Sequence, residues 1–183
     1  MMRVLLDACV LYPTVMREVL IQTASAGLFQ PLWSPRICEE WRRAAARHGP
    51  SDAVHVEGEI ALLNSKWPKA SVTPRDGDLA RLWLPDPNDI HVLAAAVAGS
   101  ADGIVTMNAK DFPRQLLAEE GVSRMDPDSF LYGLWQANPD VMEAVIERVK
   151  AQAEHLSGQP WQRRALLKKA RLPRLGKAVS EPR

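Results

Sequence analysis

The chain has 183 residues, 46% of them hydrophobic and 25% charged, and its net charge is +1. These values are typical of a globular protein with a sizeable core and exclude a disordered chain, while two cysteines are too few for a disulfide scaffold. No stretch approaches the roughly 20 apolar residues of a membrane span, and Asp7 interrupts the apolar N-terminal run too early for a signal peptide. We therefore expect a cytoplasmic protein in which Cys9 and Cys38 are free thiols.

The charge is unevenly distributed along the chain. From Arg148 onward there are ten basic and two acidic residues, whereas the preceding part has thirteen basic and twenty acidic residues. This arrangement predicts an acidic body followed by a basic tail.

Apolar periodicity and turn residues predict five elements in the first 70 residues. Ser34 followed by Pro35 has the pattern of a helix N-cap and first helical position. The elements are strands at 4–6 and 29–33 and helices at 13–26, 34–47 and 52–67.

The rest of the chain continues the alternation of helix and strand and then becomes helical. Asp86 precedes Pro87 as a candidate N-cap, and an alanine-rich helix follows. The predicted strands are 71–73, 103–106 and 123–125, and the predicted helices are 90–98, 111–120, 127–137, 139–156 and 161–170. The remaining tail, with Pro173, Gly176 and Pro182, is expected to fray. This order predicts an α/β fold with a parallel sheet.

Acidic side chains follow the ends of two predicted strands. Asp7 ends the first strand, Asn108 and Asp111 follow the strand at 103–106, and Asp89 lies in the first turn of the preceding helix. In parallel sheets, ligands bind at the carboxyl edge, so we expect these groups to converge there, together with Glu40 from its helix. Carboxylates brought this close would repel one another unless they held Mg²⁺ or Mn²⁺.

Spacing alone leaves simpler explanations open for each of these residues. An Asp at a strand end commonly forms a turn, Asp89 suits a helix N-terminus, Asp111 suits a helix cap, and Asp86 is assigned mainly to capping. The histidines lack zinc-site spacing, and neither a glycine-rich phosphate loop nor a Gly-x-Ser-x-Gly motif is present.

Four segments together resemble a known family. They are VLLDACVLY, SPRICEEWRR, DPNDIHVLAAAVAGSADGIVTMNAKDFP and DPDSFLYGL, and they span about residues 2–135. The chain resembles PIN-domain ribonucleases, and among them the VapC-type toxins of type II toxin–antitoxin pairs. The resemblance implies a PIN-like three-layer α/β fold, with a nuclease domain at 1–137 and a helical, basic C-terminal extension at 138–183.

The resemblance also implies a function and a set of site residues. The function is that of a metal-dependent endoribonuclease, the toxin of such a pair, acting on RNA, bound by a cognate antitoxin and forming a homodimer. The implied catalytic residues are Asp7, Glu40, Asp89 and Asp111; the implied metal ligands are Asp7, Asp89, Asp111 and Asn108, with Thr106 in support. Glu40 matches the family pattern better than Glu39. Because Asn108 stands where relatives also have Asp, we expect one firmly bound Mg²⁺ or Mn²⁺, with a second ion arriving only with substrate.

Two other functions stay open on sequence grounds. One is an RNA-processing or DNA nuclease of the same fold that is not a toxin, and the other is an inactive PIN-like module that binds RNA or protein. The tail is equally open: it has the composition of an RNA-contacting element, but also that of a solubilising helix anchored by a tryptophan. The residues concerned are Trp161, Arg163, Arg164, Lys168, Lys169 and Arg171.

Overall fold

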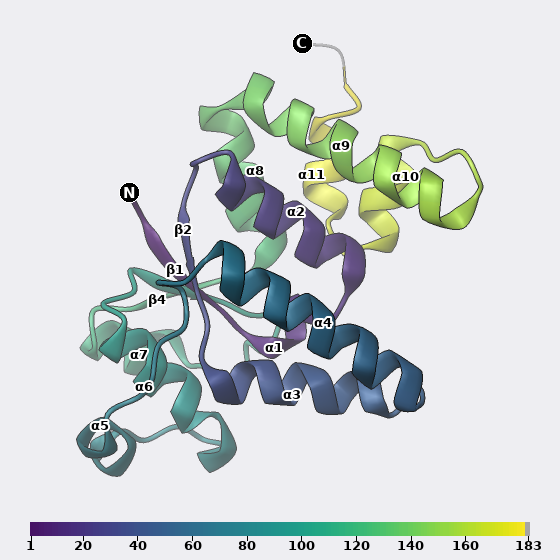
Figure 1. The fold of residues 1–183 in the computed structure, drawn as a ribbon. Helices are drawn as coiled ribbons and strands as arrows, with labels where there is room; N and C mark the ends of the chain where they lie inside the picture. Colours follow the sequence, from purple (N-terminus) through teal and green to yellow (C-terminus); the bar gives the residue numbers. More distant parts are fainter. Residues whose placement is uncertain (182–183) are drawn as a thin grey trace. The chain divides into compact units, whose positions relative to one another are not determined.

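A four-stranded parallel sheet flanked by helices is the central feature of the computed structural model, which describes residues 1–181 (Figure 1). The strands are β1 (Arg3–Leu6), β2 (Gln30–Leu32), β3 (Gly103–Val105) and β4 (Ser123–Met125). Their order is β2-β1-β3-β4, so β1 and β3 occupy the centre. The predicted α/β fold with a parallel sheet is confirmed.

The two central strands are buried along most of their length. Val4, Leu5 and Leu6 have no exposed surface, and neither do Ile104 and Val105. Continuous apolar runs of this kind are typical of parallel strands covered on both faces. Strands β3 and β4 also approach closely at Gly103, where a Cβ would overlap the Met125 side chain and lie 2.9 Å from the Ser123 carbonyl oxygen.

By their internal contacts the described residues form two compact units, and the first contains the sheet. It comprises Met1–Tyr12 and Gln30–Met125. Its helices are α1 (Ala8–Leu11), α3 (Pro35–Ala46), α4 (Pro50–Lys66), α5 (Asp76–Arg81), the 3₁₀ turn η1 (Pro87–Asp89), α6 (Ile90–Ala98) and α7 (Arg114–Glu119). Helix α3 packs against α1 and α4, whereas α6 packs against β1 and β3.

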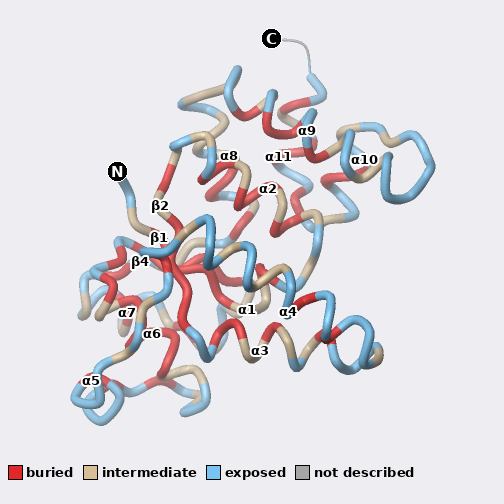
Figure 2. The backbone as a smooth tube through the Cα atoms, viewed as in Figure 1, coloured by how far each residue is buried: buried red, intermediate tan, exposed pale blue. Residues whose placement is uncertain are grey.

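The second compact unit is helical and consists of Pro13–Phe29 with residues 126–181. Its helices are α2 (Thr14–Ser25), α8 (Pro127–Ala137), α9 (Pro139–Ser157), α10 (Arg163–Lys169) and α11 (Pro173–Ala178). Helix α2 packs against α9 although more than a hundred residues separate them. Figure 2 shows buried and exposed positions alternating along these helices, as expected where each buries one face.

Most predicted elements are present, with ends that differ by one or two residues. The structure corrects five predictions. The helix expected at 111–120 begins only at Arg114, the strand expected at 71–73 is a single bridge from Ser71 to Trp33, and α1 and α5 were not expected at all. The tail was expected to fray, yet residues 173–178 form α11; Pro182 lies outside the described residues.

The cause of the error in the tail is a cap that is distant in sequence. Pro173 stands in the first turn of α11, where its missing N–H costs no hydrogen bond. The carboxylate of Asp128 accepts hydrogen bonds from the backbone N–H groups of Arg174 and Leu175 at 2.8 and 2.9 Å. Leu175 is fully buried. Local breaker residues therefore gave the wrong prediction because the stabilising contacts come from another helix.

Among the described residues, no helix combines the length and the apolar character needed to cross a bilayer. The division into a domain at 1–137 and an extension at 138–183 stays a prediction.

Candidate metal centre

The pairing of the two central strands places Asp7 beside Thr106. Leu6 and Val105 are partners in the parallel ladder, and each of the two polar residues follows one of them. The Thr106 hydroxyl donates a hydrogen bond of 2.8 Å to Asp7 Oδ2 and accepts one of 3.0 Å from the Asn108 backbone N–H. Both side chains are buried. The carboxyl edge of the sheet therefore holds Asp7 in a fixed orientation.

Asp7 also begins helix α1. Its Oδ1 accepts a hydrogen bond of 2.8 Å from the backbone N–H of Ala8, which is an N-cap contact. Burial raises the pKa of Asp7, and the charge of Glu40 raises it further, while hydrogen bonds from Thr106, Ala8 and Cys9 lower it. The N-cap contact and the hydrogen bond from Thr106 thus use different oxygens of the same carboxylate.

Three further carboxylates gather around η1. One oxygen each from Asp86, Asp89 and Asp111 lies within 4.8 Å of the others. Asp86 caps η1 through a 2.9 Å hydrogen bond from the Asn88 N–H, as the sequence predicts. The structure also places Asp86 in the cluster, which the sequence interpretation did not.

Asn108 lies among these carboxylates and donates to them. Its Nδ2 is 2.9 Å from Asp111 Oδ2 and 3.4 Å from Asp89 Oδ2, while its Oδ1 accepts the Asp111 backbone N–H at 3.3 Å. The amide nitrogen therefore faces the acids here. For Asn108 to bind a metal through its oxygen, as predicted, the amide group would have to rotate so that Oδ1 and Nδ2 exchange places.

The negative charge gathered in the centre affects the pKa of Asp89. Partial burial is the largest cause of its rise to about 6, and the charges of Asp7, Asp86, Asp111 and Glu40 add to it. Like charges in one pocket favour the protonated form of an acid. Five carboxylates from four separate stretches of the chain thus act on one site.

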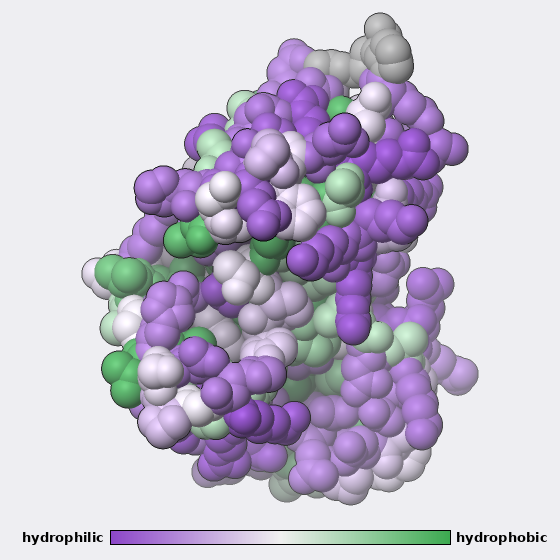
Figure 3. Space-filling view, turned by 90° about the vertical axis from the view of Figure 1, so that its right-hand side faces the viewer, coloured by the Kyte–Doolittle hydropathy of each residue, from purple (hydrophilic) through white to green (hydrophobic). Residues whose placement is uncertain are grey.

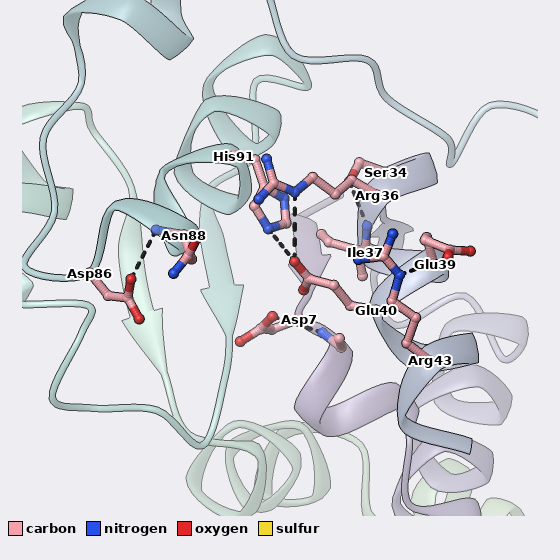
Figure 4. A network of polar contacts seen from close by, with 11 residues as sticks. Asp7, Ser34, Arg36, Ile37, Glu39, Glu40, Arg43, Asp86, Asn88 and His91 are labelled. Atoms are coloured by element: carbon pink, nitrogen blue, oxygen red, sulfur yellow. Dashed lines mark hydrogen bonds and ion pairs between the residues drawn. The ribbon is translucent and has the colours of Figure 1, made fainter. Parts of the chain in front are cut away.

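Glu40 points into this centre from α3 (Figure 4). Its Oε1 lies 2.6 Å from His91 Nε2 and 3.8 Å from Arg36 Nε. His91 belongs to α6 and is only 2% exposed. The buried imidazole therefore lies against the Glu40 carboxylate at ion-pair distance, although neither of its ring nitrogens makes a hydrogen bond of good geometry with the described residues.

Glu39, one residue earlier, has a different environment. It accepts hydrogen bonds from Arg42 and Arg43, which lower its pKa to about 2. The structure thus turns Glu40 towards the acids and Glu39 towards the arginines on the helix surface, as Figure 4 shows.

Cys9 lines the same edge as a neutral group. Its Sγ lies 3.4 Å from Asp7 Oδ2 and 3.5 Å from Thr106 Oγ1. Burial, followed by the charge of Asp7, raises the pKa of the thiol to about 12. Cys9 and Cys38 are both free, as predicted.

The donor set fits a hard divalent cation. Carboxylate oxygens are the ligands that Mg²⁺ and Mn²⁺ prefer, and a cation would relieve the mutual repulsion that raises the pKa of Asp89. Asp7, Asp89, Asp111 and Glu40 interact as one group. The sequence missed Asp86 and His91: Asp86 had a complete capping explanation, and a lone histidine inside an apolar helix gives no local signal.

Comparison with known proteins identifies the family of the chain. A model of the PIN domain family matches residues 3–110, which is more than half of the chain. The chain therefore belongs to the PIN domain family. It is 33% identical over 94 residues, 46% of this chain, to a Mycobacterium tuberculosis protein named "Putative ribonuclease VapC50". That match spans 56% of the relative's length. No solved structure matches significantly.

Proposed function

We propose that the protein is a metal-dependent endoribonuclease of the PIN family and the toxin of a toxin–antitoxin pair. One observation carries the proposal: five carboxylates act on one site at the carboxyl edge of a parallel sheet, where burial and then the charges of the other four raise the pKa of Asp89 to about 6. Family membership and the name of the M. tuberculosis relative support RNA as the substrate.

Each side chain has a proposed role. Asp7, Asp89 and Asp111 would hold Mg²⁺ or Mn²⁺, with Asn108 beside them. When bound, such an ion lowers the pKa of water and stabilises charge on phosphate oxygens. Glu40 orients the attacking water and accepts its proton, while Thr106 keeps Asp7 in place through the 2.8 Å hydrogen bond.

The partners follow from the same proposal. A cognate antitoxin would cover the acidic centre and block access of RNA, and the chain would act as a homodimer in the cytoplasm. The antitoxin is testable by co-expression: the gene product of a neighbouring reading frame would abolish cleavage and co-purify with the chain.

Cleavage of RNA with Mg²⁺ or Mn²⁺ tests the proposed function. We expect Asp7→Asn and Glu40→Gln to lower the cleavage rate by about a hundredfold or more, because each removes a group from the reacting centre. Glu39→Gln is the matched control, since it makes the same change one residue away on the same helix and should keep wild-type cleavage. Equal cleavage by wild type and Asp7→Asn, or none by either, would contradict the proposal.

A further inference from the structure

Helices α10 and α11, with the turn between them, form a cationic segment. Residues 163–178 include seven Lys or Arg and no Asp or Glu. No acidic side chain within the segment therefore balances its positive charge. Contacts with the rest of the fold show which of these cations have a structural partner.

Several of these cations have structural partners. Arg163 pairs with Glu147 and donates a 3.2 Å hydrogen bond to the Val179 carbonyl oxygen. The Arg174 guanidinium lies 4.1 Å from the centre of the Tyr132 ring, and Lys177 lies 3.9 Å from Glu181. Through these contacts the segment is attached to helices α8 and α9 and to the residues that follow it.

Three others have no such partner. Arg164, Lys168 and Arg171 are exposed, and no carboxylate among the described residues pairs with them. Arg164 and Lys168 are four residues apart on α10 and so lie on one face of it. Arg171 follows in the turn after α10. We call these three residues the α10 cations.

The opposite side of the segment is anchored. Four leucines on that side are at most 3% exposed: Leu166, Leu167, Leu172 and Leu175. Their packing holds the backbone that carries the cations in place. These leucines are also not available for insertion into a bilayer, which a membrane-binding amphipathic helix needs. Most of the surface in view in Figure 3 is hydrophilic, with apolar residues interspersed.

The backbone conformation of Arg171 does not favour arginine. Its φ is +61°, and its N–H and that of Leu172 bond to the carbonyl groups of Lys168 and Leu167. This is the turn that ends many helices, and glycine is the usual residue at that position because it has no Cβ. Arginine is strained there, yet it supplies a charge that no described carboxylate uses.

We infer that the α10 cations bind the phosphate backbone of single-stranded RNA, an inference that rests on the proposed ribonuclease function. Repeated unpaired cations on a rigid support suit a polyanion, because each phosphate contact releases a counterion. Aromatic rings with nearby cations border the segment: Lys169 Nζ lies 5.1 Å from the centre of the Trp161 ring, and Tyr132 lies under Arg174. Rings of this kind stack on bases in proteins that bind single strands.

The test measures RNA binding without cleavage. A fluorescein-labelled 20-nucleotide single-stranded RNA is titrated with the full chain in EDTA over a range of salt concentrations. The variant Arg164→Gln/Lys168→Gln/Arg171→Gly should reduce the slope of log affinity against log salt by about 2, at roughly 0.7 per lost contact. At about 0.1 M salt its affinity should fall by about tenfold to a hundredfold.

Two controls separate local contacts from net charge and from misfolding. The triple variant Arg47→Gln/Lys69→Gln/Arg75→Gln removes the same charge from exposed positions in the other compact unit and should leave the slope nearly unchanged. The single variant Arg171→Gly should weaken RNA binding while keeping or raising the melting temperature, since glycine relieves the strain.

Three results would overturn the inference. They are an unchanged slope for the α10 triple variant, equal losses in both triple variants, and binding of the wild type to phosphatidylglycerol vesicles but not to RNA. Because no divalent ion is present, these results are independent of cleavage. Failure of the proposed function would instead appear as Asp7→Asn cleaving RNA like the wild type.

Discussion

Asp89 is the residue in which the electrostatics of the centre can be measured. Its pKa rises from 3.8 to about 6, through burial first and neighbouring carboxylates second. Between these two pH values the folded protein binds more protons than the unfolded chain. The contribution of Asp89 to the free energy of unfolding therefore falls as pH rises from about 4 to about 6, and its loss is complete above that range.

This sign gives a pH-dependent prediction for the protein in EDTA. Asp89→Asn removes the titrating group, so the variant should gain stability relative to wild type at pH 7.5 and much less at pH 4.5. Thermal unfolding at the two pH values measures this difference. Parallel pH profiles for the two proteins would show that the environment of Asp89 is not as described.

His91 is the second residue with a testable role. Its Nε2 lies 2.6 Å from Glu40 Oε1 in a buried position, so we expect it to orient the carboxylate. His91→Phe should lower the single-turnover cleavage rate by about tenfold to a hundredfold, the usual cost of losing an orienting partner. His91→Gln keeps a donor near the position of Nε2 and should recover part of the rate.

A purely structural role for His91 predicts a different pattern. In that case the cleavage rates of the Phe and Gln variants would follow their melting temperatures. The two variants would then have the same cleavage rate at saturating RNA. Measuring both quantities on the same preparations distinguishes the two roles.

At the scale of the element, helix α3 positions Glu40, and Ser34 defines where that helix starts. The buried Ser34 hydroxyl accepts a 3.1 Å hydrogen bond from the Ile37 N–H, and Pro35 follows in the first turn. Six residues later Glu40 faces the acids. The local N-cap pattern is thus sufficient to predict where this helix begins, whereas the preference for Glu40 over Glu39 came from the family resemblance.

Loss of that cap should destabilise the protein. We expect Ser34→Ala to lower the free energy of unfolding by about 1 kcal/mol, because the Ile37 N–H loses its acceptor in a buried position. Urea denaturation measures the change. Ser65→Ala, on the exposed surface of α4, is the control and should stay within about 0.5 kcal/mol of wild type.

Agreement between predicted and observed elements follows how local their signals are. Helix α6 has the predicted bounds because its run of alanine and aliphatic residues, with polar turns on either side, determines them locally. The segment at 111–120 was misjudged because Asp111 bonds to Asn108 instead of capping α7. Residues 71–73 lacked a neighbour that would extend the single bridge into a strand.

At the scale of the whole molecule, bound divalent ion should stabilise the folded state. At a concentration about 100-fold above its Kd a ligand adds about 2.7 kcal/mol. For a chain of this size that corresponds to a rise in melting temperature of roughly 5 to 10 °C. Thermal melts with and without Mn²⁺ measure the shift.

Matched variants identify where the stabilising ion binds. Asp7→Asn should lose most of the shift, whereas Asp52→Asn, which removes an exposed carboxylate near the start of α4, should keep it. A full shift in Asp7→Asn would place the stabilising ion elsewhere on the molecule.

The sequence by itself determined the alternation of helices and strands that gives a parallel sheet, the strand ends beside Asp7 and Thr106, and the N-cap at which α3 begins. Each of these features depends on neighbours within a few residues. Only the tertiary structure decided that Asp86 joins Asp89 and Asp111, that Asn108 turns its amide nitrogen to the acids, and that His91 meets Glu40. The tertiary structure also decided that Asp128 caps a helix some 45 residues away. In these cases the partners come from separate segments or depend on side-chain orientation, so the contact exists only after the chain has folded.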